Sequence, residues 1–343
     1  MPAPKHILAI RFSAMGDVAM TVPVIRAVLE QNPEVIITIV SRPEFASFFL
    51  NIPRLHYFAA DLEVTYKGFG GLIRLFRTLK KDRRYYALAD LHDNLRTKVI
   101  RKLFGLSGLP YAFVDKGREE KRQLTRFPGK VLVPLKPTTA RYADVFEKIG
   151  IKVTLDNQLV KNPPPLAGKL LKITGDKTNT WIGIAPFAKH KGKIYPLERT
   201  EMVIESLNKK NVRIFLFGGS VQEEEVCFQW QQKYSSVTSL VRRITMEEEL
   251  TIISRLDVMM SMDSAGMHLA SMEGIPVISV WGATHHYAGF LGYGQSENNI
   301  VADDIECRPC SIYGNKPCFR KDYACLYNIA PETIIKSLEK FIR

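Results

Sequence analysis

Two series of alternating apolar and amphipathic segments run along the 343-residue chain, and they restrict its fold more than any other feature. In the first half, the segments "HILAIRF", "VIITIVS" and "YYALADL" have the short, branched, apolar character of buried strands. Helical segments follow Gly16 and recur near residues 43–50, 70–81 and 94–104. Strands that alternate with helices in this way predict βαβ units and a parallel sheet.

The proline-rich stretch "KNPPPLAGK" separates this half from a second series. The second half contains the strand-like segments "TWIGIAPF", "VRIFLFGG", "DVMMSMD" and "IPVISVWG", with helical segments between them. The sequence therefore predicts an α/β protein with two Rossmann-like domains, over residues 1–165 and 166–326, followed by a last amphipathic helix over residues 327–343. Two such domains are expected to hold the active cleft between them, at the carboxyl ends of their strands.

Composition narrows the class of protein. Hydrophobic residues make up 46% of the chain and charged residues 24%, as in folded soluble proteins. No stretch approaches the roughly 18 apolar residues of a membrane span, and the amino-terminal segment lacks the long apolar centre of a signal peptide. We therefore expect a cytoplasmic protein.

The formal net charge of +13 indicates an anionic partner, since 48 Lys and Arg face 35 Asp and Glu. Basic side chains gather in the first half, for example in "RLFRTLKKDRRYY" and "RTKVIRK". An anionic substrate, a membrane surface and a nucleic acid would all satisfy this charge. The chain has neither an aromatic RNP-like motif nor a compact basic helix. Nucleic-acid binding would therefore explain only the charge and no other feature of the sequence, and it is disfavoured.

The stretch "RFSAMGDVAMTVPVIRAVL" places Asp17 in the turn between the first strand and the first helix. Ser13, Ala14 and Gly16 leave room for a ligand near the backbone, and open α/β sheets bind ligands at such turns. Asp17 is therefore either a helix cap or a functional carboxylate of the active cleft.

A second turn, in "SMDSAGMHLASMEG", joins a buried strand to a helix at Asp263. The small residues Ser264, Ala265 and Gly266 allow backbone amides at the helix N-terminus to hold a diphosphate. His268 is close enough in the chain to reach the same anion or a sugar hydroxyl. The structural alternatives are a helix cap for Asp263 and a buried structural histidine for His268.

The segment "IAPFAKHKGKIYP" carries Lys189, Lys191 and Lys193 beyond the end of a strand. A lysine at this position can neutralise a leaving phosphate. At least two of the three lysines are expected to be solvated loop residues.

Four of the five cysteines lie close together in "CRPCSIYGNKPCFRKDYAC": Cys307, Cys310, Cys318 and Cys325. A cytosolic location argues against disulfides, and a C-x2-C pair with two further cysteines can supply four thiolates to zinc. The spacing is not that of a zinc ribbon, so a structural zinc and four free or redox-active thiols stand as alternatives.

Several of these motifs together resemble glycosyltransferase family 9, the bacterial heptosyltransferases of lipopolysaccharide synthesis. The resemblance covers nearly the whole chain and rests on "RFSAMGDVAMTVPVIRAV", "DLHDNLRTKVI", "KIYP", "DSAGMHLASMEGIPVISVWGAT" and the cysteine tail. The Walker loop and the G-x-G-x-x-G, H-E-x-x-H and G-x-S-x-G motifs are absent from the sequence. The resemblance implies the GT-B architecture, with the last helix returning toward the first domain, and an inverting transfer that needs no metal.

By position, the resemblance implies that Asp17 is the general base and that Lys193 contacts the donor phosphate. The Asp-Thr-Gly-x-x-His turn of the family corresponds to a stretch in which Ala265 replaces the glycine, and Ser220 stands where the family commonly has an acid that holds the donor ribose. These departures leave the identity of the donor open. The expected donor-binding residues are Lys189, Ile244, Asp263, Ser264, Ala265, Gly266 and His268.

The activity that the resemblance implies is transfer of a heptose from ADP-heptose to an anionic lipid A and inner-core acceptor. The enzyme would then work at the cytoplasmic face of the inner membrane, in peripheral contact with it. We expect the acceptor to be contacted by Arg74, Arg77, Lys80 and Arg96. The alternatives are a transferase for another nucleotide sugar, a sugar-nucleotide epimerase of the same fold, and a transferase that binds without turnover.

Overall fold

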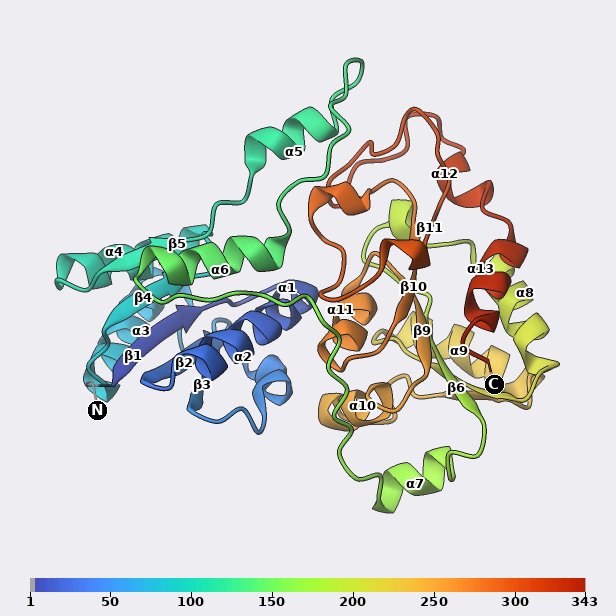
Figure 1. Ribbon diagram of the computed structural model, residues 1–343, viewed down its shortest axis with the longest axis horizontal. Helices are drawn as coiled ribbons and strands as arrows, with labels where there is room; N and C mark the ends of the chain where they lie inside the picture. Colours follow the sequence, from blue (N-terminus) through green and yellow to red (C-terminus); the bar gives the residue numbers. More distant parts are fainter. Residues whose placement is uncertain (1–3, 343) are drawn as a thin grey trace. The chain divides into compact units, whose positions relative to one another are not determined.

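The computed structural model describes residues 4–342, and these form two compact α/β units (Figure 1). Unit 1 consists of Met1–Arg118 and Lys136–Asp156, and unit 2 consists of Glu119–Leu135 and Asn157–Arg343. Each unit holds one sheet in which all strand pairs are parallel. The prediction of an α/β chain with two parallel-sheet domains is therefore confirmed.

The sheet of unit 1 has the strand order β3-β2-β1-β4-β5. Its central strand, β1, is buried from Ile7 to Ile10, and alternate residues serve the two faces of the sheet. Leu8 and Ile10 pack in one apolar cluster with side chains of α3 and α4, whereas α2 and α6 pack against each other. The elements of unit 1 are β1 (Lys5–Ile10), α1 (Met15–Ala19), α2 (Thr21–Gln31), β2 (Val35–Ser41), the 3₁₀ helix η1 (Pro43–Phe49), β3 (Leu55–Ala59), α3 (Gly68–Asp82), β4 (Ala87–Asp90), α4 (Leu95–Leu106), β5 (Tyr111–Phe113) and α6 (Thr138–Lys148).

The sheet of unit 2 repeats this topology and adds one strand, in the order β11-β10-β9-β6-β7-β8. Its core joins β6 and β9 to the apolar faces of α8, α9 and α13. The elements are α5 (Arg118–Leu124), α7 (Gly168–Thr174), β6 (Thr180–Ala185), η2 (Lys191–Lys193), α8 (Leu197–Asn208), β7 (Val212–Leu216), α9 (Val221–Lys233), β8 (Val237–Ser239), α10 (Met246–Ile253), β9 (Val258–Met262), α11 (Ala265–Met272), β10 (Val277–Trp281), η3 (His286–Ala288), η4 (Glu297–Asn299), β11 (Ile300–Ala302), α12 (Ala324–Tyr327) and α13 (Pro331–Glu339).

The chain passes from one unit to the other three times, after residues 118, 135 and 156. The sequence, in contrast, indicated a single boundary at residue 165. Residues 119–135 belong to unit 2 because their side chains find partners there. The Lys121 ammonium lies 4.4 Å from the ring centre of Phe290, and the Leu135 amide donates to the Tyr287 carbonyl at 2.8 Å. No periodicity in the local sequence indicates these partners.

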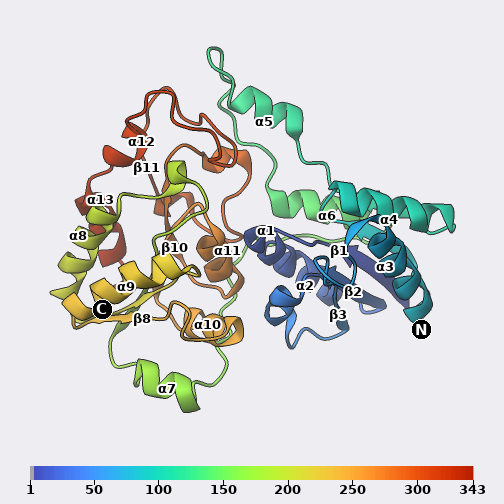
Figure 2. The same cartoon turned by 180° about the vertical axis from the view of Figure 1, so that it is seen from behind.

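The last helix, α13, packs within unit 2. Ile334 and Leu338 are fully buried in the core of that unit, and α13 lies beside α8, as Figure 2 shows from behind. The apolar face of α13 is buried in unit 2. That this helix returns toward the first domain, as the family resemblance implies, stays a prediction.

Four short strands lie outside the segments that the sequence indicated: β3, β5, β8 and β11. All four are edge strands, which have one hydrogen-bonded neighbour and less need of a continuous apolar run. β3, for example, has the burial pattern of a half-exposed strand.

Candidate active site

The topology gives each sheet one point at which the strand order reverses, and ligands of open α/β sheets bind at that point. In unit 1 it lies between β1 and β4, and in unit 2 between β6 and β9. The turns that follow these strands carry Asp17, His92, Lys193 and Asp263. Asp17, Lys193 and Asp263, which the sequence singled out, therefore lie at the ligand-binding positions of their own sheets.

Asp17 is held in unit 1 by a buried arginine. The Arg11 Nη2 atom lies 2.6 Å from Asp17 Oδ2, and the Ala14 amide donates to the same oxygen at 3.3 Å. Arg11 is 6% exposed and donates from Nη1 to the Leu91 carbonyl at 2.7 Å. Asp17 thus closes the first turn of α1, as a capping residue does, and its carboxylate is also held in place by Arg11, with 30% of its side chain exposed.

His92 follows β4 and lies beside this pair, although the sequence did not single it out. The Phe12 amide donates to His92 Nδ1 at 3.3 Å, so the ring proton of the neutral form is assigned to Nε2. Burial, and next to it the charge of Arg11, lowers the pKa of His92 to about 3. His92 is therefore a neutral imidazole at pH 7. The feature that could have indicated it is its position one residue beyond a buried strand.

An ion-pair network fixes the turn that carries His92. Asp90 is fully buried, and its Oδ1 atom accepts hydrogen bonds from the His92 and Asp93 amides at 3.0 and 2.9 Å. The Arg101 guanidinium donates to Asp90 at 2.8 Å and to Asp93 at 2.9 Å. Because these buried charges are paired and hydrogen-bonded, the turn is held rigidly.

Two further cations approach the same turn from the segment after β5. The Lys116 ammonium donates to the Asp93 carbonyl at 3.1 Å, and Arg118 Nη2 lies 3.4 Å from Asp93 Oδ2. Burial, followed by the charge of Arg11, lowers the pKa of Lys116. Lys116 thus adds positive charge to the carboxyl edge of the unit 1 sheet.

The four expected acceptor-binding residues lie on helices of unit 1. Arg74, Arg77 and Lys80 are exposed on α3, where Arg74 donates to the Thr65 carbonyl at 3.3 Å. The end of α3 leads into the start of β4, so Lys80, near the end of α3, lies at the amino edge of the sheet. Asp17 lies at the opposite, carboxyl edge. Arg96 is exposed in the first turn of α4. The acceptor role of these residues stays a prediction, and the topology favours Lys116 and Arg118 as additional candidates.

In unit 2 the lysine singled out in the sequence pairs with the aspartate that ends β9. Lys193 Nζ lies 2.9 Å from Asp263 Oδ2, with side-chain exposures of 16% and 5%. The N-cap residue of α11 is Ser264, one residue later than Asp263. Asp263 therefore orients Lys193 beside the N-terminus of α11 instead of capping that helix. The positive charge and the helix amides are together suited to an anionic group.

Gly266 is required by packing. An added Cβ atom would lie 2.7 Å from the Ala185 Cβ and 2.9 Å from Ser261 Oγ. The absence of a side chain allows α11 to approach the ends of β6 and β9, which brings its first turn to the edge of the sheet.

The Lys193 side chain is covered by the cysteine tail. An added Cβ atom on Gly314 would lie 2.5 Å from Lys193 Cγ, and the Ala283 amide donates to the Gly192 carbonyl at 2.8 Å. Lys189 and Lys191 are exposed, as expected for two of the three lysines. The tail therefore helps to fix the one lysine that is partly buried.

The sequence analysis connected three further positions with donor binding. His268 is 7% exposed on α11, and Ile244 is half-buried just before α10. Ser220 caps α9, and the amides of Gly219 and Ser220 donate to Glu223 Oε2 at 2.7 and 3.0 Å. Glu223 is thus an acid close after β7, three residues beyond the position that the family pattern indicates. The donor contacts of Ile244 and His268 stay predictions.

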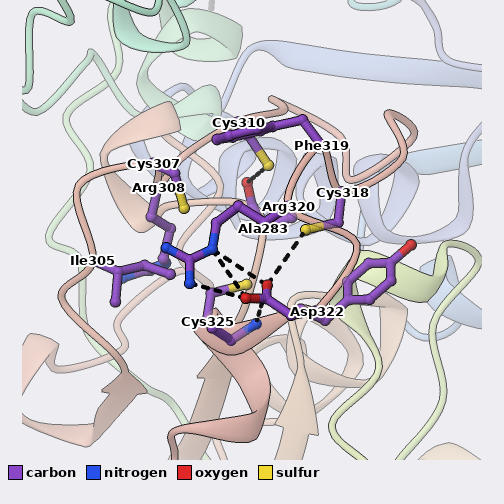
Figure 3. A pocket seen from close by; sticks show the side chains of 12 residues that line it. Ala283, Ile305, Cys307, Arg308, Cys310, Cys318, Phe319, Arg320, Asp322 and Cys325 are labelled. Atoms are coloured by element: carbon purple, nitrogen blue, oxygen red, sulfur yellow. Dashed lines mark hydrogen bonds and ion pairs between the residues drawn. The ribbon is translucent and has the colours of Figure 1, made fainter.

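The four cysteines of the tail line one pocket (Figure 3). The Cys310 thiol donates to the Ala283 carbonyl at 3.8 Å, and burial raises the pKa of the Cys325 thiol to about 12. Among residues 4–342, no group of three or more His, Cys, Asp or Glu side chains has an arrangement that could hold a metal ion. The sulfurs are thus gathered, but not placed as a preformed metal site.

Comparison with known proteins gives the family. The sequence description of glycosyltransferase family 9 (heptosyltransferase) matches residues 73–318. The chain belongs to this family. The prediction of a family 9 glycosyltransferase is thereby confirmed, and the two parallel-sheet units are the domains of its GT-B fold.

Curated relatives of this glycosyltransferase are heptosyltransferases of low sequence identity. Lipopolysaccharide heptosyltransferase 3 of Escherichia coli is 21% identical over 79% of this chain and 82% of its own length. Lipooligosaccharide heptosyltransferase 2 of Campylobacter jejuni is 24% identical, but the match covers only 37% of this chain and 40% of that protein.

Solved structures share the fold of the glycosyltransferase. A family 9 glycosyltransferase from Veillonella parvula has a TM-score of 0.76 and 16% identity, over 99% of this chain and 98% of the other. E. coli heptosyltransferase WaaC with ADP has a TM-score of 0.66 and 17% identity, over 98% of this chain and 99% of the other. In the described residues of the present chain, no helix is long and apolar enough to cross a membrane.

Proposed function

We propose that this glycosyltransferase transfers a heptose from ADP-heptose to the inner core of lipopolysaccharide, with inversion at the anomeric carbon. The names of its relatives support the sugar and the acceptor, since they are lipopolysaccharide or lipooligosaccharide heptosyltransferases. The structure of WaaC with ADP supports the nucleotide. The observation that carries the proposal is the matching chemistry of the two switch points: a fixed carboxylate, Asp17, in unit 1 and a fixed ammonium, Lys193, in unit 2.

Asp17 is the general base of this proposal. Its carboxylate takes the proton of the acceptor hydroxyl while the hydroxyl oxygen forms a bond to the anomeric carbon. A base within hydrogen-bond reach contributes about 10²- to 10⁴-fold to a rate. Arg11 fixes the position of the Asp17 carboxylate before the acceptor binds.

Lys193 and the first turn of α11 serve the leaving group. The bond between the anomeric carbon and the β-phosphate oxygen breaks, and its electron pair stays on the departing ADP. The Lys193 ammonium and the backbone amides at Ser264 and Ala265 stabilise this charge by fixed dipoles. One displacement with attack opposite to the leaving group inverts the anomeric carbon.

The acceptor is an anionic lipid, so the enzyme is proposed to work at the cytoplasmic face of the inner membrane. Lys116 and Arg118, at the carboxyl edge of the unit 1 sheet, are suited to phosphate or carboxylate groups of the inner core. Clustered Lys and Arg also raise affinity for anionic lipid surfaces.

The first test is turnover of the wild type and Asp17→Asn with ADP-heptose and a de-acylated, phosphorylated acceptor, together with calorimetric binding of ADP. The proposal expects turnover in the wild type, a loss of at least a hundredfold in the variant, and unchanged ADP affinity. Binding of ADP without transfer by the wild type would show that the donor sugar or the acceptor is wrong. Failure of both proteins to bind ADP would remove the nucleotide assignment.

The four tail cysteines are proposed to bind one structural zinc ion, with four free thiols as the alternative. Support comes from their gathering around one pocket and from the affinity of thiolates for zinc. Elemental analysis of the purified chain should find one zinc per molecule in the wild type and none in Cys307→Ser/Cys310→Ser. Wild-type protein that holds no zinc after expression in zinc-supplemented medium would favour the free thiols.

A further inference from the structure

An exposed apolar and basic surface lies on unit 2 and includes none of the residues assigned to the reaction. It is formed by the loop between α5 and α6, residues 125–134, which Figure 1 shows as a narrow hairpin after α5. Phe127 is 55% exposed, and Val131, Leu132 and Val133 are 45%, 46% and 50% exposed. We call these four side chains, together with Phe319, the hairpin patch.

Contacts within unit 2 fix the hairpin patch. The Val131 amide donates to the Gln123 carbonyl at 3.2 Å, which closes the hairpin, and Lys130 Nζ donates to the Glu306 carbonyl at 2.9 Å. The rings of Phe127 and Phe319 lie side by side, with their centres 5.9 Å apart, although Phe319 is itself 60% exposed. The fold thus holds two aromatic rings at the surface instead of burying them, and clustered exposed apolar groups of this kind mark interaction sites.

The charges around the hairpin patch select the partner. Residues 119–135 carry four basic side chains against two acidic ones, and residues 316–322 carry three basic side chains against one acidic one. Arg122 pairs with Glu119 at 3.0 Å and Arg320 pairs with Asp322 at 2.9 Å, which leaves a net positive charge in both segments. Arg122 and Arg126 are exposed close to Phe127 in the chain, and Lys316 is exposed close to Phe319. Aromatic rings flanked by cations fit a bilayer whose surface is anionic, because the rings enter the headgroup region while the cations meet the lipid phosphates.

We propose that the hairpin patch docks unit 2 on an anionic lipid bilayer, with Phe127 and Phe319 inserted at the interface. The inference deepens the proposed function, since it rests on an acceptor that is embedded in a membrane. It places the membrane contact on one basic segment of the first half of the chain, which packs in unit 2, together with Phe319 of the cysteine tail. A single apolar or electrostatic contribution gives weak and reversible binding, whereas the two together give stable peripheral attachment.

The experiment measures partition of the full chain to vesicles of phosphatidylglycerol and phosphatidylethanolamine, with phosphatidylcholine vesicles for comparison. Phe127→Ser/Phe319→Ser should lower partition to the anionic vesicles about tenfold, since each ring removes apolar area from water. Arg126→Glu should lower it about fivefold or more at low salt, because each cation near the surface adds about 1 kcal/mol. Wild-type partition should fall as salt is raised.

Phe228→Ser is the matched control, because Phe228 on α9 is also 55% exposed and lies outside the hairpin patch. It should partition like the wild type. Equal partition of the wild type and Phe127→Ser/Phe319→Ser, or equal losses in the control, would overturn the proposal. So would a self-association in solution that the double variant abolishes, combined with no vesicle binding by the wild type, since the patch would then join two copies of the chain.

Turnover separates this inference from the proposed function. With a de-acylated soluble acceptor, Phe127→Ser alone should keep the wild-type rate, and with acceptor embedded in vesicles its rate should fall several-fold. Vesicle partition is measured without donor, so its result tests the docking proposal even if ADP-heptose is not the donor. An equal loss of rate with both acceptors would mean that the patch acts within the enzyme and not on the membrane.

Discussion

At the scale of single residues, each proposed reacting group is controlled by one neighbour of opposite charge. Arg11 fixes Asp17 from a buried position, and Asp263 fixes Lys193. Each pair places a charge at the edge of a sheet without leaving it unpaired in the protein, which would be costly. The neighbours are therefore positioning residues, and their removal has consequences that differ from removal of the reacting groups themselves.

Arg11→Gln is expected to lower kcat about tenfold to a hundredfold, because Asp17 loses the guanidinium that fixes its position. Binding of ADP should be unchanged, since Arg11 lies outside the proposed donor site. The measurements are kcat and calorimetric ADP binding, with the exposed Arg84→Gln as the control. Wild-type kcat in Arg11→Gln would contradict the positioning role of Arg11.

Lys193→Met is expected to weaken ADP binding about tenfold to a hundredfold, as loss of a charge-assisted hydrogen bond does. It also leaves Asp263 buried without its ammonium, so the free energy of unfolding should fall by about 1–3 kcal/mol. The double variant Lys193→Met/Asp263→Asn should recover part of the stability and none of the affinity. Calorimetry with ADP and urea unfolding test both parts, and Lys191→Met is the exposed control. Wild-type affinity in Lys193→Met would remove Lys193 from the donor site.

At the scale of elements, the reaction site depends on how closely two helix starts approach the strand ends. In unit 1, the Asp90 and Arg101 network holds the turn between β4 and α4. In unit 2, the approach of α11 to β6 and β9 depends on Gly266, where a side chain would collide with Ala185 and Ser261. The spacing of secondary structure elements is thus set by single residues whose role is packing.

Gly266→Ala is expected to destabilise the protein by about 1–3 kcal/mol, as overpacking of a well-filled core does. The added methyl group would lie 2.7 Å from the Ala185 Cβ, so α11 must shift. Gly266→Ala/Ala185→Gly should recover part of the loss, since it removes the nearer of the two obstacles. Gly219→Ala is the control, because an added Cβ there meets open space among the described residues. Thermal or urea unfolding measures the effect, and equal stability of both single variants would contradict it.

At the scale of the whole molecule, each unit contains a histidine that is buried in its neutral form. Burial, and then the charge of Arg11, lowers the pKa of His92 in unit 1 to about 3. In unit 2, burial and then the charge of Arg308 lower the pKa of His285 to about 3. The two residues are 8% and 9% exposed, so both units share a sensitivity to acid.

The chain is expected to lose stability as the pH falls from about 6.5 to about 3. Above this range both histidines are neutral in the folded and unfolded chain; within it the unfolded chain binds protons that the folded chain excludes. Each histidine contributes at most about 1.4 kcal/mol per pH unit. Urea midpoints at pH 7.5, 6.0 and 5.0 measure the slope, which His92→Gln should flatten and the exposed Lys102→Gln should not. Equal slopes in His92→Gln and the wild type would contradict the assignment of His92.

The sequence by itself determined the two parallel-sheet domains, the family and the turns that hold the proposed site. These follow from local information: a buried parallel strand needs a continuous apolar run, as in "VMMSM", and the turn after it carries the functional residue next in the chain. Asp17, Lys193 and Asp263 could be located for this reason.

Only the tertiary structure decided which side chains meet. The pair of Lys193 with Asp263, the place of His92 beside Arg11 and Asp17, and the packing of residues 119–135 in unit 2 all join separate segments. Even the pair of Arg11 with Asp17, six residues apart, depends on the conformation of the turn between them. The pair of Lys193 and Asp263 joins residues 70 positions apart. Such contacts depend on the order of strands in a sheet and on which apolar surfaces find each other, and neither is encoded in the periodicity of any one segment.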